Sequence, residues 1–338
     1  MTSEGMNRSD MKLVTVVIPN WNGMKFLNTC LSALRLQDTE DFTTLMIDNA
    51  SEDGSVSFMR ENFPEVQVEV MPENLGFSGG VNEGIRRAKT PYVLLLNNDT
   101  EVTPGFVSGL LKAIEKDPKI FSVSAKMLKF DDRDRIDDAG DLYNLLGWGA
   151  QRGIDRNASD KKYNKACTVF SACAGAAIYR KSVFEEMGLF DLNHFAYLED
   201  IDVGYRAMLY GYKNVYEPSA VVYHVGSGTT GSKYNDFKVR IAARNNIYLL
   251  RKNMPLPQRI ANGPFLLLGR GLKALFFKKR GFSEAYKAGL KEGKEKASGL
   301  TRVPYSVQKS GRYFKIQLLL IRYTFTYFFE YLGRRIHH

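Results

Sequence analysis

Acidic and amide side chains follow two predicted strands at the point where each strand ends. Asp48 closes the apolar run "TTLMID" (43–48), and residues 97–99, Asn-Asn-Asp, follow "YVLLL" (92–96). A single Asp at a strand end is more typical of a turn or a helix cap. Two such residues on neighbouring strand ends favour a site for a divalent cation, which needs oxygen ligands and open positions for phosphate oxygens. Asp99 is therefore a candidate metal ligand.

A second group of carboxylates lies within residues 199–202, where Glu199, Asp200 and Asp202 occur together among apolar residues. A carboxylate in such surroundings can have its protonation state tuned, which suits a general base. The structural alternative is a charged helix start, because acidic residues favour the first turn. Asp202 and Arg206 are four residues apart, a spacing that favours an ion pair on a helix.

Two glycine-rich stretches adjoin further candidates. The segment "NLGFSGGVNEGI" (74–85) is a turn that leads into a helix, where a backbone can approach an anion closely. Its spacing departs from the dinucleotide-binding pattern, which argues against hydride transfer. His224 ends a strand just before the second stretch, "GSGTTG" (226–231). It has either a structural role or a role in a loop that closes over a ligand.

Strand-like and helical patterns alternate from Leu13 to about Ile120. Continuous apolar strands joined by helices predict an α/β fold with a mostly parallel sheet covered on both faces. Ligands of such sheets bind beyond the carboxyl ends of the strands, where the polar candidates gather. The predicted strands are 13–19, 43–48, 66–70 and 92–96, and the predicted helices lie at 26–36, after Asp53 and at 81–88.

The pattern changes after this half. Residues 131–165 are rich in Asp, Arg, Lys and Gly, which predicts a long, mobile surface connection or a flap that binds an acceptor. The strand and helix signals resume at 173–191, continue with a helix around 199–210 and a strand at 220–224, and give way to helices from Asn235 onward.

The composition is that of a folded protein with a basic end. The chain has 338 residues, of which 44% are hydrophobic and 25% charged, and a net charge of +10. Residues 251–338 hold 19 Lys and Arg against 4 Asp and Glu. Three cysteines without a CxxC pattern argue against a disulfide framework. The polar first twelve residues and the lack of an apolar run of about 18 residues predict neither a secretory signal nor a spanning helix. We expect a cytoplasmic protein that touches the inner face of the plasma membrane.

The basic end mixes cations with apolar residues in segments 263–280 and 312–335. Lys315 and Arg322 lie two helical turns apart, with aromatic residues and leucines around them. Such helices can lie in the interface of an anionic membrane. The alternatives are a helical subdomain packed on the core and a dimer contact. No recognisable motif supports binding to nucleic acid.

Taken in order along residues 12–250, these motifs resemble family 2 glycosyltransferases of the GT-A fold. "TVVIPNWNG" resembles the first strand and turn of the family, and "MIDNASEDGS" its nucleotide-binding segment. "LLLNNDT" stands where the family carries its DxD metal motif, and "YLED" resembles the motif whose Asp is the catalytic base. The first acid of the DxD motif is Asn97 here, so that metal binding would depend on Asp99.

The resemblance implies a role for each candidate. It makes Asp200, with Glu199, the catalytic pair, and Asp99 and His224 the ligands of Mn²⁺ or Mg²⁺. Arg206 and Asp202 would either assist the leaving diphosphate or pair structurally. The residues expected to bind the donor nucleotide are Pro19, Asn22, Asp48, Asn49, Asp53, Asn74, Gly76, Asn82 and Asn98.

Within the family, "NWNG", "NLGFSGG", "LLNNDT" and "YLEDIDVGYR" are most similar to the bacterial rhamnosyltransferase-like branch. This resemblance implies an inverting transferase that takes a sugar from dTDP-L-rhamnose or a UDP-sugar. Its acceptor would be a saccharide or a polyprenyl-diphosphate-linked glycan of a cell-surface polysaccharide. We expect a GT-A domain over 12–235 and a helical, basic, membrane-associated region over 236–338. The competing interpretations are a nucleotidyltransferase and a catalytically degenerate module that binds sugar nucleotides.

Overall fold

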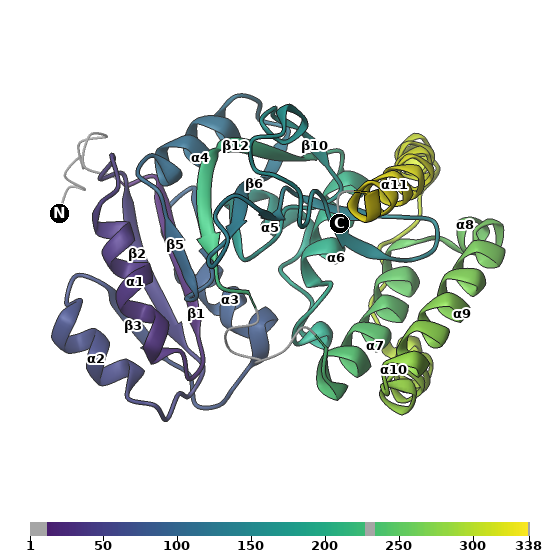
Figure 1. Cartoon of the computed structure of the whole chain (residues 1–338), viewed down its shortest axis with the longest axis horizontal. Helices are drawn as coiled ribbons and strands as arrows, with labels where there is room; N and C mark the ends of the chain where they lie inside the picture. Colours follow the sequence, from purple (N-terminus) through teal and green to yellow (C-terminus); the bar gives the residue numbers. More distant parts are fainter. Residues whose placement is uncertain (1–11, 227–233, 337–338) are drawn as a thin grey trace, which may run out of the picture.

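The computed structural model describes residues 12–226 and 234–336. The polar N-terminal segment and most of the glycine-rich stretch after His224 lie outside the described residues. A ten-stranded sheet forms the centre of the molecule in the order β10-β12-β6-β11-β4-β1-β2-β3, with β5 paired to β12 and β7 to β6 (Figure 1). Strands β8 and β9 form a separate two-stranded sheet.

The strands of the structure have the following bounds: β1 Val14–Asn20, β2 Phe42–Asp48, β3 Gln67–Val70, β4 Tyr92–Leu96, β5 Thr100–Val102, β6 Ile120–Lys129, β7 Ile136–Asp138, β8 Asp141–Tyr143, β9 Gly149–Gln151, β10 Cys167–Val169, β11 Ala176–Arg180 and β12 Lys213–His224. The helices are α1 Met24–Arg35, α2 Ser55–Asn62, α3 Gly76–Arg87, α4 Phe106–Glu115, α5 Lys181–Met187, α6 Glu199–Tyr210, α7 Asp236–Asn253, α8 Leu256–Ala261, α9 Gly263–Lys279, α10 Ser283–Lys296 and α11 Ser310–Ile336.

Most strands of the sheet run in one direction. Neighbours β3, β2, β1 and β4 are parallel, and β6 is parallel to β12. Strand β11 lies between β4 and β6 and is antiparallel to both. The predicted α/β fold with a mostly parallel sheet is therefore confirmed, and the sheet is mixed because of this reversed strand and the short edge strands.

The apolar side chains of the strands alternate between two cores. Val14, Val16 and Ile18 point to one face of the sheet, which α1, α2 and α4 cover. Val17 points to the opposite face, where it packs with side chains of α3, α5 and α6. Burial of both faces explains why these strands are continuous apolar runs. The four strands predicted in the first half of the chain agree with β1 to β4 to within about one residue.

Residues 131–165 were predicted as a mobile surface connection or a flap that binds an acceptor, and the prediction of a surface connection is wrong. The segment contains β7, β8 and β9, and β7 pairs with β6 of the main sheet. Ile136, Asp138 and Tyr143 are each fully buried. The polar composition led to the wrong prediction because several carboxylates of this segment lie inside the protein.

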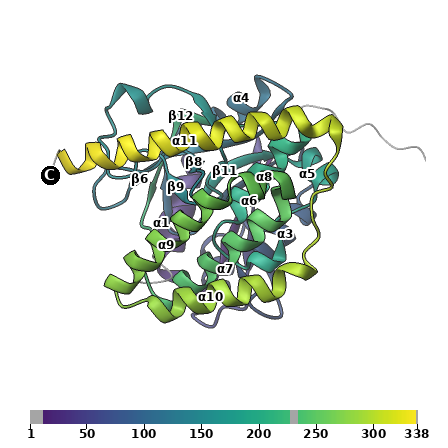
Figure 2. The ribbon, with the colours of Figure 1, turned by 90° about the vertical axis from the view of Figure 1, so that its right-hand side faces the viewer.

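Helices α7 to α11 pack beside the sheet (Figure 1), and α11 crosses the upper part of this helical side (Figure 2). Tyr313, Ile316 and Leu320 of α11 join a third core with side chains of α6 and α7. Glu330 of α11 accepts hydrogen bonds from the Gly153 backbone and the Tyr163 hydroxyl. No helix among residues 12–226 and 234–336 is long and apolar enough to cross a membrane.

Candidate active site

Side chains from three neighbouring strands meet at the carboxyl edge of the sheet. Asn20 ends β1 and donates to Asp48 Oδ1 at 2.9 Å, and Asn98, just after β4, donates to Asn20 Oδ1 at 2.7 Å. The strand pairing places Pro19 opposite Ile47, next to this group. Because β1, β2 and β4 are parallel, their ends bring together residues that are far apart in sequence.

The turn after β1 depends on the absence of a side chain at Gly23. A Cβ atom there would lie 2.0 Å from Asn98 Nδ2 and 2.6 Å from Asn20 Oδ1. The same turn is tied to the segment after β2, because Asn22 accepts a hydrogen bond from Glu52 N at 2.8 Å. These contacts hold the edge of the sheet in one arrangement.

Asp53 and Asn49 support the surrounding loops. Asp53 Oδ2 accepts a hydrogen bond from Met24 N at 2.8 Å. Burial alone would raise the pKa of Asp53, but this hydrogen bond and those from Ser55 lower it. Asn49 donates to Gly76 O at 3.3 Å. Asp53 and Asn49 therefore join the turns that border the edge.

The glycine-rich segment packs against the residues that precede α6. Asn74 Oδ1 accepts from Gly76 N at 2.9 Å, and Gly76 has a φ of +69° that favours glycine. A Cβ atom at Gly76 would lie 2.5 Å from the ring of Phe195. Asn82 is buried farther along α3 and exchanges two hydrogen bonds with the Phe190 backbone. Its amide is therefore used within the fold.

Asp99 and His224 approach each other on neighbouring strand ends. His224 Nε2 lies 3.3 Å from Asp99 Oδ1, and His224 Nδ1 lies 2.7 Å from Asp137 Oδ2. Burial alone would lower the pKa of His224, but the two carboxylates raise it to about 10. A divalent cation would take the place of the proton on Nε2. With Nδ1–H donated to Asp137, a neutral His224 and one Asp99 oxygen could then hold the cation, with positions left open for a ligand. Asp137 holds the other ring nitrogen, as outer carboxylates do for ligating histidines.

The first turn of α6 carries Glu199 and Asp200. Burial raises the pKa of Asp200 to about 6, although backbone N–H groups of Ile201 and Ala174 oppose the change. Burial also raises the pKa of Glu199, and the nearby charge of Asp200 adds to the effect. Among the described residues nothing donates to Glu199 Oε2. Asp200, which remains partly exposed, is the better placed of the two to accept a proton near neutral pH.

Asp202 and Arg206 form the expected pair one turn farther along. Arg206 donates to Asp202 Oδ2 at 2.9 Å and to the backbone oxygens of Met187, Gly188 and Leu189. Burial by itself would raise the pKa of Asp202, but Arg206 and Lys252 hold it well below its usual range. Both side chains are almost fully buried, which favours the structural alternative.

A strained turn positions α6. Phe195, Tyr197 and Leu198 have φ values of 62°, 70° and 67°, in a region that costs non-glycine residues on the order of 1–3 kcal/mol each. Asn245 of α7 donates to the backbone oxygens of His194, Ala196 and Tyr197 at 2.8–2.9 Å. These contacts join residues on the two sides of the domain boundary predicted between residues 235 and 236. The boundary itself stays a prediction.

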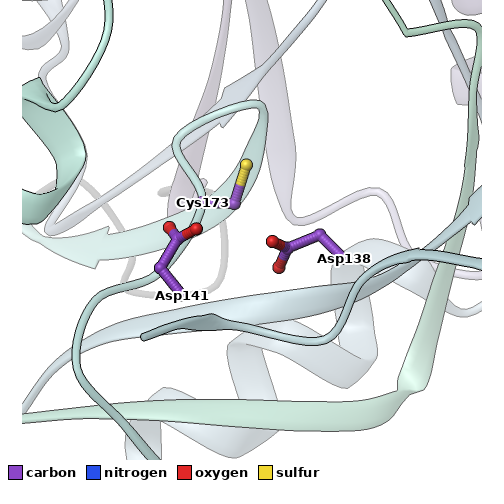
Figure 3. Close-up of side chains that lie close together, drawn as sticks. All are labelled: Asp138, Asp141 and Cys173. Carbon is purple, nitrogen blue, oxygen red and sulfur yellow. The ribbon is translucent and has the colours of Figure 1, made fainter. Parts of the chain in front are cut away.

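Three acidic residues of the 131–165 segment belong to the same region. Asp137 contacts His224, and Asp138 and Asp141 lie close to Cys173 (Figure 3). They were not among the predicted site residues, because the polar composition of the segment indicates exposure. The available signal was the stretch "RIDDAGDLY", in which Ile136, Ala139 and Leu142 lie next to the acids and indicate a buried segment.

The two sides of the site are connected through the turn before β11. Asn97 N, next to the Asn98–Asp99 pair, donates to Gly175 O at 2.8 Å. The adjacent Ala174 N donates to Asp200. The 173–175 turn therefore connects the end of β4, which precedes Asp99, with Asp200 at the start of α6.

Comparison with known proteins identifies the family. The model described as "Glycosyl transferase family 2" matches residues 15–188, about half of the chain. The chain belongs to glycosyltransferase family 2. The resemblance stated above is thereby confirmed, and the protein is a glycosyltransferase enzyme.

The chain is similar to a curated relative and to two solved structures, among others. The N-acetylglucosaminyl-diphospho-decaprenol L-rhamnosyltransferase of Mycobacterium tuberculosis is 26% identical over 240 residues, which cover 65% of this chain and 78% of that protein. GalNAc-T7 with UDP, GalNAc and Mn²⁺ matches with a TM-score of 0.60 at 16% identity, over 87% of this chain and 55% of that one. A mannosyltransferase of Pyrobaculum calidifontis with GDP-Man and Mn²⁺ matches with a TM-score of 0.55 at 14% identity, over 94% and 86%. These likenesses confirm the GT-A fold.

We predict that Gly23→Ala destabilises the carboxyl edge of the sheet. The backbone at Gly23 has a φ of −111°, which alanine adopts easily, so the effect would come from the clash with Asn98 and Asn20 alone. Overpacking of this kind costs about 1–3 kcal/mol, measured as the free energy of unfolding in urea. Gly271→Ala is the control, because its Cβ meets nothing within 4 Å. Equal stability of the Gly23 variant and the wild type would contradict the prediction.

Proposed function

We propose that the protein is an inverting glycosyltransferase that moves a sugar from a nucleoside diphosphate donor to a saccharide or a polyprenyl-diphosphate-linked acceptor. The observation that carries the proposal is the position of Asp200. A carboxyl group with a pKa of about 6 borders the same region as the Asp99–His224 pair and the strand-end amides. Family membership supplies the reaction class, and this arrangement supports a base on one side and a donor on the other.

The donor nucleotide is assigned to the carboxyl edge of the sheet. Asp48, Asn20 and Asn98 hold one another by hydrogen bonds, so their orientation is fixed before a ligand binds. The loops carrying Asn22, Asn49, Asp53, Asn74 and Gly76 border the edge. We favour dTDP-L-rhamnose as donor, with a UDP-sugar as the alternative, because the Mycobacterium tuberculosis relative is named an L-rhamnosyltransferase.

Asp99 and His224 are the residues that would hold Mn²⁺ or Mg²⁺. The cation, when bound, neutralises negative charge on a leaving diphosphate. The chain contributes the rest of the chemistry. Asp200 accepts the proton of the attacking hydroxyl as its oxygen bonds to the anomeric carbon, and the bond between that carbon and the diphosphate oxygen breaks on the opposite side of the sugar. The Asn245 contacts keep the turn before α6, and with it Asp200, in place.

We predict that Asp200→Asn lowers kcat by about 10²–10⁴-fold, which is the usual contribution of a positioned general base. Donor affinity should stay within about twofold, because Asn keeps the size of the side chain and the nucleotide lies on the other side. Release of nucleoside diphosphate and calorimetric binding of the nucleotide measure the two quantities. Glu185→Gln, on the exposed side of α5, is the matched control. Wild-type turnover by the Asp200 variant would show that another group is the base.

We predict that Asp99→Ala removes the effect of Mn²⁺ on donor binding. A cation with one protein ligand fewer binds more weakly, and the diphosphate loses the charge that attracts it. Calorimetry of nucleotide binding with and without Mn²⁺ measures the change. Glu101→Ala is the control, since it removes an acid two residues away that is paired with Arg133. If Mn²⁺ strengthened binding equally in both variants, Asp99 would not be a ligand.

The acceptor and the membrane are assigned to the helical side. The relative's acceptor, as named, is a decaprenol-linked diphosphate, and a lipid-linked acceptor requires the enzyme to reach a membrane surface. Helix α11 has a buried face with Tyr313, Ile316 and Leu320. Its other face exposes five apolar side chains at helical spacing: Phe314, Leu318, Phe325, Phe329 and Leu332. With the cations of residues 251–338, this apolar face fits an anionic lipid surface at which the protein would bind from the cytoplasm.

We predict that Phe329→Asp weakens binding to vesicles that contain about one third phosphatidylglycerol. A charge in the apolar face costs several kcal/mol of transfer free energy, so co-sedimentation should fall about tenfold or more. Leu36→Asp is the matched control, because Leu36 and Phe329 are both 71% exposed and Leu36 lies just after α1, away from α11. Undiminished sedimentation would exclude α11 as the membrane face. Conversion of a dimer into a monomer by the same substitution would instead assign the face to a second copy of the chain.

A further inference from the structure

A buried acidic group lies directly behind Asp200. Asp138 from β7, Asp141 from β8 and Cys173 from the turn before β11 bring one atom each to within 4.8 Å of one another (Figure 3). Asp138 is 0% exposed and Asp141 is 7% exposed. Asp141 is also a hydrogen-bonding neighbour of Asp200. The carboxyl groups of Asp138, Asp141 and Asp200 therefore form a connected row in which Asp141 neighbours the other two.

The hydrogen-bond donors near Asp138 and Asp141 are too few to stabilise two ionised carboxylates. Asp138 Oδ1 accepts from Gly140 N at 2.5 Å, and Ser171 Oγ lies 3.4 Å from Asp141 Oδ2. Among the described residues nothing donates to Asp138 Oδ2, and no cationic side chain pairs with Asp138 or Asp141 within that part of the chain. An ionised carboxylate only accepts hydrogen bonds, so protons must lie between these groups if they are to satisfy one another.

We propose that Asp138 and Asp141 are both neutral acids at physiological pH and that Asp141 donates its O–H to the Asp200 carboxylate. In this arrangement Asp138 shares a hydrogen bond with Asp141. Asp141 is a positioning residue, since it touches the base and not the substrate. The inference rests on the proposed function of Asp200, and it adds that a neutral acid orients the base and keeps it ionised.

The electrostatics of the row agree with this assignment. Burial raises the pKa of Asp138 to about 8, and burial raises that of Asp141 well above its usual range. A hydrogen bond from a neutral Asp141 stabilises the ionised form of Asp200, so it lowers the pKa of Asp200 against the opposing effect of burial. Removal of this donor should therefore raise the pKa of Asp200, and more of the base would be protonated at neutral pH.

Other titratable groups face the row from every side. They are Asp137 beside Asp138, Cys173 in the turn before β11, Tyr179 on β11 and Glu199 on α6. Burial raises the pKa of Cys173, Tyr179 and Glu199, and Cys173 and Tyr179 are neutral near pH 7. Asp137 belongs to the His224 contact and is compensated there. Asp200 is thus the carboxyl group of the row that changes charge near pH 6.

The direct test is carboxyl ¹³C NMR of the ligand-free full chain between about pH 4 and about pH 9. In the wild type the Asp200 carbon should titrate near pH 6, and the carbons of Asp138 and Asp141 should remain those of neutral acids at pH 7. Asp141→Ala should raise the Asp200 midpoint by about one pH unit. Asp141→Asn, whose amide still donates, should reverse most of that change, and Asp134→Ala, an exposed acid of the same segment, should cause none.

Three results would overturn the inference. The first is an ordinary titration of Asp138 and Asp141 near pH 4, and the second is the same Asp200 midpoint in the Ala and Asn variants. Co-purification of one divalent cation per chain, lost on Asp141→Ala, would also overturn it in favour of a metal held by Asp138, Asp141 and Cys173. Thermal unfolding of each variant shows whether the fold is retained before the titrations are compared.

Measurements of turnover distinguish a failure of this inference from a failure of the proposed function. Asp141→Ala should lower kcat about tenfold at pH 6 and move the acidic limb of the pH profile upward, while Asp141→Asn recovers most of the loss. A merely structural defect would lower kcat equally at every pH. If Asp200→Asn kept full turnover, the proposed function of Asp200 would fail. If Asp200→Asn were inactive and the two Asp141 variants behaved alike, only the present inference would fail.

Discussion

The turn before α6 exists in its present form because α7 holds it. Phe195, Tyr197 and Leu198 have positive φ values. Each of these backbone conformations is unfavourable, and contacts outside the turn must compensate for it. The Asn245 amide donates to three backbone oxygens of this turn and is fully buried. If these hydrogen bonds were lost, the turn could relax, the start of α6 would shift, and Asp200 would no longer border the edge of the sheet.

Two carboxylates on the first turn of α6 show how neighbouring positions acquire opposite properties. Asp202 faces Arg206 and Lys252, which hold its pKa low and keep it ionised. Asp200 faces the buried carboxyl row, and burial raises its pKa. The helix thus separates a permanent charge, which joins α6 to the surrounding loops, from a charge that can be gained and lost near neutral pH.

The first half of the sheet could be predicted from sequence because its signals are local. The strands β1 to β4 are apolar runs followed by turn residues, and their parallel arrangement places Asn20, Asp48 and Asn98 at one edge. Strand β6 was not predicted, since Ser122, Ser124 and Lys126 interrupt its apolar pattern. All three are buried. Lys126 Nζ donates to Ala158 O at 2.7 Å, a partner 32 residues away that no local pattern could supply.

The same reasoning explains which parts of the candidate site were found. Asp99, Asp200 and His224 follow or begin regular elements, so their positions could be inferred from the ends of strands and helices. Asp137, Asp138 and Asp141 lie in a segment whose charge indicates exposure, and only the tertiary contacts show that it is buried. The role of Asn245 could not be predicted from sequence. Its amide lies within a helix, and only the tertiary structure shows that it contacts the turn before α6.

The reversed strand β11 has a consequence for how the site can diversify. Its direction brings its first residues, and the 173–175 turn before them, to the edge where the parallel strands end. The region proposed for the donor is built by residues 14–99, and the region around Asp200 by later segments of the chain. Substitutions in one stretch, away from its contacts with the other such as Gly76 with Phe195, can therefore alter which molecule is accepted there while the other region keeps its shape. Such a division lets new pairings of donor and acceptor arise without rebuilding the scaffold.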